Sequence, residues 1–201
     1  MRKGTTTEWM AGALIVALAI VLIVRTVAAP GARVSGALQA TARWSFILFW
    51  CAYAGNALAV VFGPRFQAIA HRCRDFALAY ASAHLAHIGM VAWMMLTSDT
   101  PFGRFELIFF GTAIFWTYLL ALLSIKTLAA RLDPKLLRTL RTIGVEYIAL
   151  VFLAGFARNP FQGGIVNLVI YLPFLALAIA GPLLRFAAVV KRMGHPRTLA
   201  T

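Results

Sequence analysis

The sequence predicts an all-α protein, a bundle of six membrane-spanning helices that forms a single membrane domain over residues 1–201. Three observations favour this fold class. The chain is 62% hydrophobic, and its mean hydropathy is +0.84. Only 12% of its residues are charged, whereas a soluble domain has about a quarter. Finally, the apolar residues form runs of about 20, which is the length that a helix needs to cross the hydrocarbon core of a bilayer.

Five of the apolar runs meet this length directly. We expect spans at residues 9–29, 44–63, 76–98, 107–125 and 161–184, and the helix-breaking pair Gly63-Pro64 ends the second of them. The first run is also similar to a signal peptide, because basic residues precede it and small residues follow it. Its uncharged core over residues 9–24 is long for a signal peptide, and without it the number of spans would be odd, so we favour a retained helix.

The fifth span in chain order, residues 134–157, is the least obvious because its first half is basic. Asp133 is a suitable N-cap and Pro134 suits the first helical position, so a helix is expected to begin there. The basic side chains can extend to the head-group layer, which leaves Glu146 as the one acid well inside a span.

The Lys and Arg side chains set the expected orientation. Most of them fall on the side of the two termini: Arg2, Lys3, Arg65, Arg72, Arg74, Lys126, Arg131, Lys135, Arg138, Arg141, Arg185, Lys191, Arg192 and Arg197. The others are Arg25, Arg33, Arg43, Arg104 and Arg158. The positive-inside rule therefore predicts that both termini are cytoplasmic. We expect the membrane to be the cell inner (cytoplasmic) membrane. We expect the net charge of +13 to contact anionic lipids and not nucleic acid, because no basic stretch lies among aromatic residues in a soluble module.

Ionisable side chains inside a membrane are costly, so the few that this chain places there are candidates for function. His84 and His87 are three residues apart in the third span and share one helix face. By the helical rise, His84 lies about 13 Å past Asp75, near the middle of the membrane. Such histidines can bind haem or another metal, carry protons, or bond to a neighbouring helix. His71 would suit a second ligand nearer the cytoplasm, or it lies in an interfacial loop.

Glu146 lies about 18 Å along its helix from Pro134, at a depth close to that of the two histidines. A buried carboxylate needs a partner, and His84 and His87 are the other titratable groups expected nearby. Our hypothesis is that Glu146 bonds to one of them. The pair would either relay protons or stabilise the contact between the two helices.

Around these residues the sequence resembles a known family. The segments TARWSF (41–46), GPR (63–65), RCRDFALAYASAHLAH (72–87) and LRTIGVEYIALVF (140–152) are similar to motifs of ferric-reductase-like transmembrane domains. This family includes the haem-binding membrane subunit of the periplasmic methionine sulfoxide reductase. The resemblance, which covers residues 35–160, implies a six-helix bundle that holds b-type haem between histidines of two helices and transfers electrons. It places His84 at a ligand position of the haem iron.

The sequence departs from this family at Arg141, which stands where relatives have a histidine in the fifth span. Two nitrogens on one helix cannot occupy opposite faces of one haem. The remaining possibilities are a five-coordinate haem on His84 or His87, an unusual second ligand, a haem shared between protomers, or no haem. Arg138 and Arg141 are one turn apart. If haem is bound, they would bind its propionates; if no haem is bound, they would bind lipid phosphates.

Two functions from different classes follow. The first is an electron-transfer membrane subunit with haem b, which would receive electrons from a redox partner protein or from quinone. It would not be a complete reductase, since the sequence has no glycine-rich nucleotide-binding motif. The alternative is a haem-free accessory or assembly subunit that packs in a larger membrane complex, and the missing fifth-span histidine favours it. A transporter or channel is a third interpretation, with His84, His87 and Glu146 as its polar path.

Overall fold

The computed structural model describes residues 5–28, 32–97, 103–158 and 164–194, and within these ranges the chain is helical without strands. Six helices are long and apolar enough to cross a membrane, as expected for a multi-pass membrane protein. They are α1 (Thr6–Val27), α2 (Arg33–Phe62), α4 (Cys73–Thr97), α5 (Arg104–Leu122), α7 (Pro134–Arg158) and α8 (Gly164–Met193). The predicted fold class is therefore confirmed at the level of six helices.

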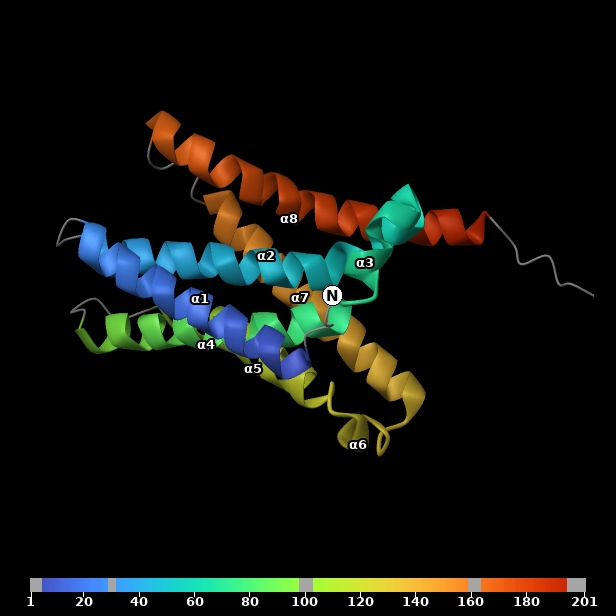
Figure 1. Ribbon diagram of the computed structural model, residues 1–201. Coiled ribbons are helices and arrows are strands. Elements are labelled where there is room, and N and C mark those ends of the chain that lie inside the picture. Colours follow the sequence, from blue (N-terminus) through green and yellow to red (C-terminus); the bar gives the residue numbers. More distant parts are fainter. Residues whose placement is uncertain (1–4, 29–31, 98–102, 159–163, 195–201) are drawn as a thin grey trace, which may run out of the picture.

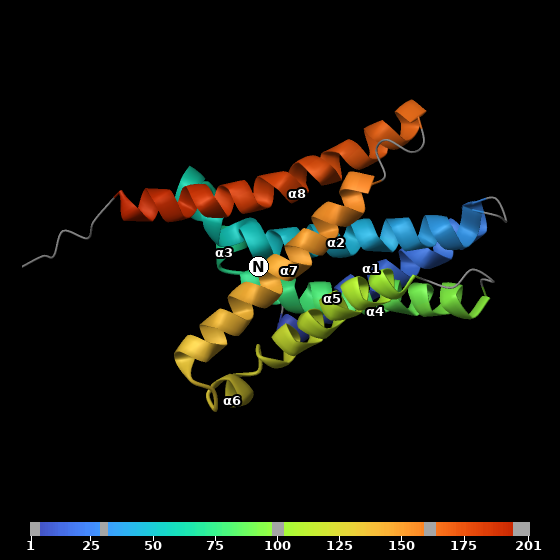
Figure 2. The same ribbon diagram turned by 180° about the vertical axis from the view of Figure 1, so that it is seen from behind.

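Short helical segments connect the long ones at one end of the bundle. η2 (Pro64–Phe66) and α3 (Gln67–Ala70) follow α2, and α6 (Lys126–Ala129) follows α5. Figures 1 and 2 show α3, α6, the beginning of α1 and the end of α8 toward the same end. We call this the basic end, because it carries the described cationic residues Arg65, Arg72, Arg74, Lys126, Arg131, Lys135, Arg138, Arg141, Arg185, Lys191 and Arg192.

The helix ends follow the local signals in the sequence. Asp133 accepts hydrogen bonds from the backbone N–H groups of Lys135 and Leu136 at 2.6 and 3.1 Å, so it caps α7 as predicted. Thr5 and Glu8 form a capping box at the start of α1. α2 ends at Gly63, whose φ of 83° is accessible to glycine and strained for other residues, and Pro64 follows it.

Two spans are longer than the hydropathy predicted. α2 begins at Arg33 and not at Trp44, and α8 continues past residue 184 to Met193. In each added segment a polar side chain has a partner: Arg43 lies over the Tyr171 ring, 4.6 Å from its centroid, and Lys191 donates to the Val61 carbonyl at 3.1 Å. The other predicted boundaries differ by a few residues, and residues 29, 98 and 161–163 of the predicted spans lie outside the described ranges.

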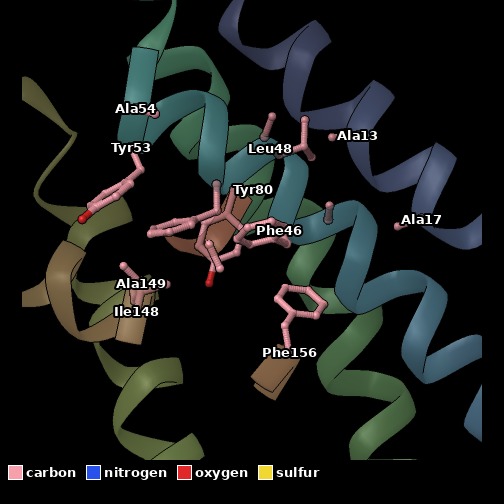
Figure 3. Packing of buried hydrophobic residues seen from close by; sticks show 14 of the residues in the cluster. Ala13, Ala17, Phe46, Leu48, Tyr53, Ala54, Tyr80, Ile148, Ala149 and Phe156 are labelled. Atoms are coloured by element: carbon pink, nitrogen blue, oxygen red, sulfur yellow. The ribbon is translucent and has the colours of Figure 1, made fainter. Parts of the chain in front are cut away.

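α2 lies at the centre of the bundle, in contact with α1, α4 and α8. Its aromatic residues form the middle of the hydrophobic core, where the Phe46 side chain is 1% exposed. Figure 3 shows the ring of Phe156 from α7 directed at Phe46, and the ring centroids are 4.8 Å apart. Aromatic packing between α2 and α7 therefore fills the volume between these helices.

α1 and α4 approach closely along small residues. Ala13 and Ala17 of α1 and Ala79 and Ala83 of α4 are buried, each pair one helical turn apart. Small side chains let helix backbones come together in a membrane. The closeness also allows Ser82 of α4 to donate a hydrogen bond to the Met10 carbonyl of α1 at 2.9 Å.

Candidate functional site

The polar side chains inside the bundle line two cavities between α4 and α7. The histidine cavity has a volume of about 180 Å³ and is lined by Gln39, Ala42, Tyr80, His84, His87, Phe110, Ala113, Ile148, Val151, Phe152, Gly155, Phe156 and Tyr171. The second cavity, of about 190 Å³, lies toward the basic end, and Cys73, Ser124, Arg141 and Arg185 are among its lining residues. Tyr80 and Ile148 line both cavities, so these two side chains separate them.

α4 places His84 and His87 on one face, as their spacing predicted. Their rings stack with centroids 5.1 Å apart and planes inclined by 23°. The Tyr80 ring lies one turn earlier, 5.2 Å from the ring of His84. The Tyr80 hydroxyl in turn is 3.0 Å from the Thr117 hydroxyl of α5. The face of α4 that points at α7 thus carries three polar rings in a row.

His87 has a partner on α2. Its Nδ1 is 3.2 Å from the Thr41 hydroxyl, which donates its proton to the Ala37 carbonyl at 2.8 Å. Because the hydroxyl has one proton, the His87 Nδ1–H is then the donor to Thr41. This assignment leaves Nε2 of His87 as an unprotonated nitrogen, the form that accepts a hydrogen bond or binds a metal.

His84 differs from His87 in its bonding. Its Nδ1 is buried and has no hydrogen-bond partner within the described part of the chain. The hydroxyl of Tyr171, another residue that lines the histidine cavity, is in the same situation. Unpaired polar atoms in an interior are uncommon and point to a functional or strained position.

His71 does not extend this row. It is an exposed residue in the turn between α3 and α4, at the basic end, and α4 begins only at Cys73. His71 thus lies in a loop, which was the second of the two interpretations of this residue, and no continuous helix joins it to His84. Among the described residues no group of three or more His, Cys, Asp or Glu side chains could hold a metal ion.

Glu146 has partners other than the histidines that we expected. Its Oε2 accepts a hydrogen bond from the Tyr53 hydroxyl of α2 at 2.7 Å, and its Oε1 lies 2.9 Å from Nη2 of Arg185 in α8. The Arg185 guanidinium also lies over the Tyr53 ring, 4.6 Å from its centroid. The hypothesis of a bond to His84 or His87 is thus corrected to a network of Tyr53, Glu146 and Arg185, here called the carboxylate network. The physical reason is helix rotation, which turns Glu146 toward α2 and α8.

Arg141 supports the end of α5. Its Nη2 donates to the Leu123 carbonyl at 2.7 Å, and Arg74 donates to the next carbonyl, that of Ser124, at 3.1 Å. Cationic donors commonly satisfy the last carbonyl groups of a helix and interact favourably with its dipole. Arg141 lines the cavity at the basic end and not the histidine cavity, so it is not positioned beside His84.

The donor set and the space can be compared with what a b-type haem requires. The two histidines project from the same face of α4, so they cannot supply both axial ligands of one iron. A cavity of about 150 Å³ holds one benzene molecule. The histidine cavity, at about 180 Å³, has room for a ligand with a single ring in this arrangement of the helices. The described residues therefore do not supply a pair of axial histidines for one haem within one chain.

The residues that bond to the predicted ones were not predicted from the sequence. Thr41, Tyr53 and Arg185 have no motif of their own, and Arg185 was counted among the lipid-facing cations. One signal was available: Tyr53 lies inside a span, where a hydroxyl requires a partner. Which helix supplies that partner depends on packing that periodicity does not define.

No protein-family model matches this sequence, and no curated protein or solved structure is significantly similar to it.

Proposed function

We propose that this protein is a haem-free accessory or assembly subunit of a larger membrane complex, related in fold to ferric-reductase-like transmembrane domains. The observation that carries the proposal is the histidine cavity, which has histidines on one side only and room for a single ring. The carboxylate network supports it, because its side chains bond to one another across α2, α7 and α8. Such bonds stabilise helix contacts and need no cofactor.

The proposal includes an orientation. We infer that the basic end faces the cytoplasm, in the cytoplasmic (inner) membrane, because the described Lys and Arg side chains concentrate there. The opposite end carries Arg25, Arg33, Arg43, Arg104 and Arg158. Reporter fusions on either side of α4 would test this orientation: a fusion after α3 should be cytoplasmic, and one at residue 100 should not.

An absorption spectrum tests the absence of haem. For this test the protein is produced in cells supplied with a haem precursor and is then purified. Its spectrum should show no Soret band above that of a matched preparation from cells that do not produce the protein. The variants His84→Ala and His87→Ala should have the same spectrum as the wild type. A Soret band in stoichiometric amount that His84→Ala removes would overturn the proposal.

The accessory role has a separate test. In mild detergent, protein isolated at its native level should have a native mass well above the 21.9 kDa of the chain and should contain a different polypeptide in fixed ratio. A monomer under conditions that keep other membrane complexes intact would contradict this role.

A second candidate is an electron-transfer subunit with a five-coordinate haem b on His84. It is favoured by the buried Nδ1 of His84, which has no hydrogen-bond partner among the described residues and so leaves this histidine with unused bonding capacity. α4 and α7 would have to separate to admit the macrocycle. Haem would supply one-electron chemistry, and the electrons would come from quinone or from a redox partner protein. The same spectra decide between the two candidates.

A further inference from the structure

A crevice between α7 and α8 opens at the basic end. Figures 1 and 2 show that the two helices diverge toward this end. The crevice has a volume of about 430 Å³, and Arg138, Arg141 and Arg185 line it together with Leu137, Thr142 and Val145. It is distinct from the histidine cavity, with which it shares no lining residue.

The three guanidinium groups of this crevice are only partly neutralised. Arg185 is paired with Glu146, and Arg141 uses one donor on the Leu123 carbonyl. The exposed guanidinium of Arg138 makes no hydrogen bond or ion pair within the described part of the chain. Three cations face one carboxylate, so the crevice carries an excess of two positive charges.

We propose that this crevice binds the head group of a phospholipid that carries two negative charges. Guanidinium groups bind phosphate oxygens with two parallel hydrogen bonds, and Arg138 and Arg141 lie one turn apart on α7. Basic pockets between membrane-spanning helices commonly bind lipids with several negative charges. Two negative charges would balance the excess charge of the crevice.

The walls of the crevice favour a lipid over a free phosphate ion. α7 and α8 are both long and apolar enough to cross the membrane, so a crevice between them at the basic end would lie at the level of the lipid head groups. Leu137 and Val145 provide apolar surface on either side of the arginines along α7. Phe186 and Val189 of α8, 70% and 51% exposed, lie within one turn of Arg185 and offer contacts to an acyl chain.

Native mass spectrometry of the full chain in detergent tests this inference with four probes: cardiolipin, phosphatidylglycerol, phosphatidylcholine and inorganic phosphate. We expect adducts of cardiolipin to be the most stable. Arg138→Gln should weaken cardiolipin binding about fivefold, since one arginine near a lipid surface contributes about 1 kcal/mol. Its melting temperature should not change, because its side chain has no internal partner.

Arg131→Gln is the matched control, because it removes one charge at the same end from an exposed residue that does not line the crevice. Equal cardiolipin binding by Arg138→Gln and Arg131→Gln would overturn the inference, as would equal retention of phosphatidylcholine and cardiolipin by the wild type. Competition by inorganic phosphate at equal concentration would assign the site to a free ion and also overturn it. The outcome does not depend on haem, which the absorption spectrum tests separately.

Discussion

Arg185 and Glu146 form an ion pair between α8 and α7, with Nη2 of the arginine 2.9 Å from Oε1 of the glutamate. Tyr53 of α2 donates to the second carboxylate oxygen, so one acid connects three helices. The two charged side chains are 36% and 45% exposed, which moderates the cost of desolvating them. The network accounts for the one acid that the sequence places well inside a span.

Replacing Glu146 by leucine should destabilise the protein by about 1–2 kcal/mol, because Arg185 and the Tyr53 hydroxyl both lose their partner. Glu146→Gln should cost less, since the amide oxygen still accepts a hydrogen bond. Thermal unfolding of the detergent-purified variants would measure both effects.

The double variant Glu146→Leu/Arg185→Leu is the control for this pair. It removes both charges, so it should be more stable than Glu146→Leu alone. Equal melting temperatures for the wild type, Glu146→Gln and Glu146→Leu would show that the network contributes nothing to stability.

The hydrogen bond between Thr41 and His87 gives a second prediction. Thr41 is fully buried, and Thr41→Val keeps its shape while removing the hydroxyl that lies 3.2 Å from Nδ1 of His87. We expect a loss of about 1 kcal/mol, in the range of other hydrogen bonds between membrane helices. Thr41→Ser should retain most of the stability because it keeps the hydroxyl.

Thr112→Val is the matched control, since the exposed Thr112 hydroxyl bonds only to the Ile108 carbonyl of its own helix. Its melting temperature should equal that of the wild type. If Thr41→Val and Thr112→Val behave alike, His87 does not need Thr41, and its tautomer is set by another group.

Much of the fold was predictable, because the length and hydropathy of a span are local properties of the sequence. The limits of α2 and α8 were not, since Arg43 contacts Tyr171 and Lys191 bonds to the Val61 carbonyl, and both of these partners are distant in the chain. A prediction based on hydropathy alone places the end of a span at the first cluster of polar residues.

The candidate site was predictable in part. A spacing of three residues sufficed to place His84 and His87 on one face. The partner of Glu146 was not predictable, because it depends on how α7 is rotated against α2 and α8. Rotation arises from close packing of side chains, such as the Phe46 and Phe156 rings, over the whole interface.

Gly181 of α8 allows the Tyr53 ring to reach Glu146. A Cβ atom at this position would lie 2.9 Å from Cε1 and 3.0 Å from Cδ1 of Tyr53; the first distance is shorter than real Cβ contacts, and the second is tighter than most of them. Gly181→Ala should therefore push the Tyr53 ring away and destabilise the protein by about 1–3 kcal/mol, the usual cost of overpacking. Thermal unfolding in detergent is again the measurement.

A double-mutant cycle separates this effect from a general change in α8. In a Tyr53→Leu background the ring is absent, so Gly181→Ala should cost much less than in the wild type. Gly89→Ala in α4 is the control, because nothing lies within 4 Å of its added Cβ, and its higher helix propensity should leave stability unchanged or raised by up to about 1 kcal/mol. Additive effects of Gly181→Ala and Tyr53→Leu would mean that the glycine does not act through the tyrosine.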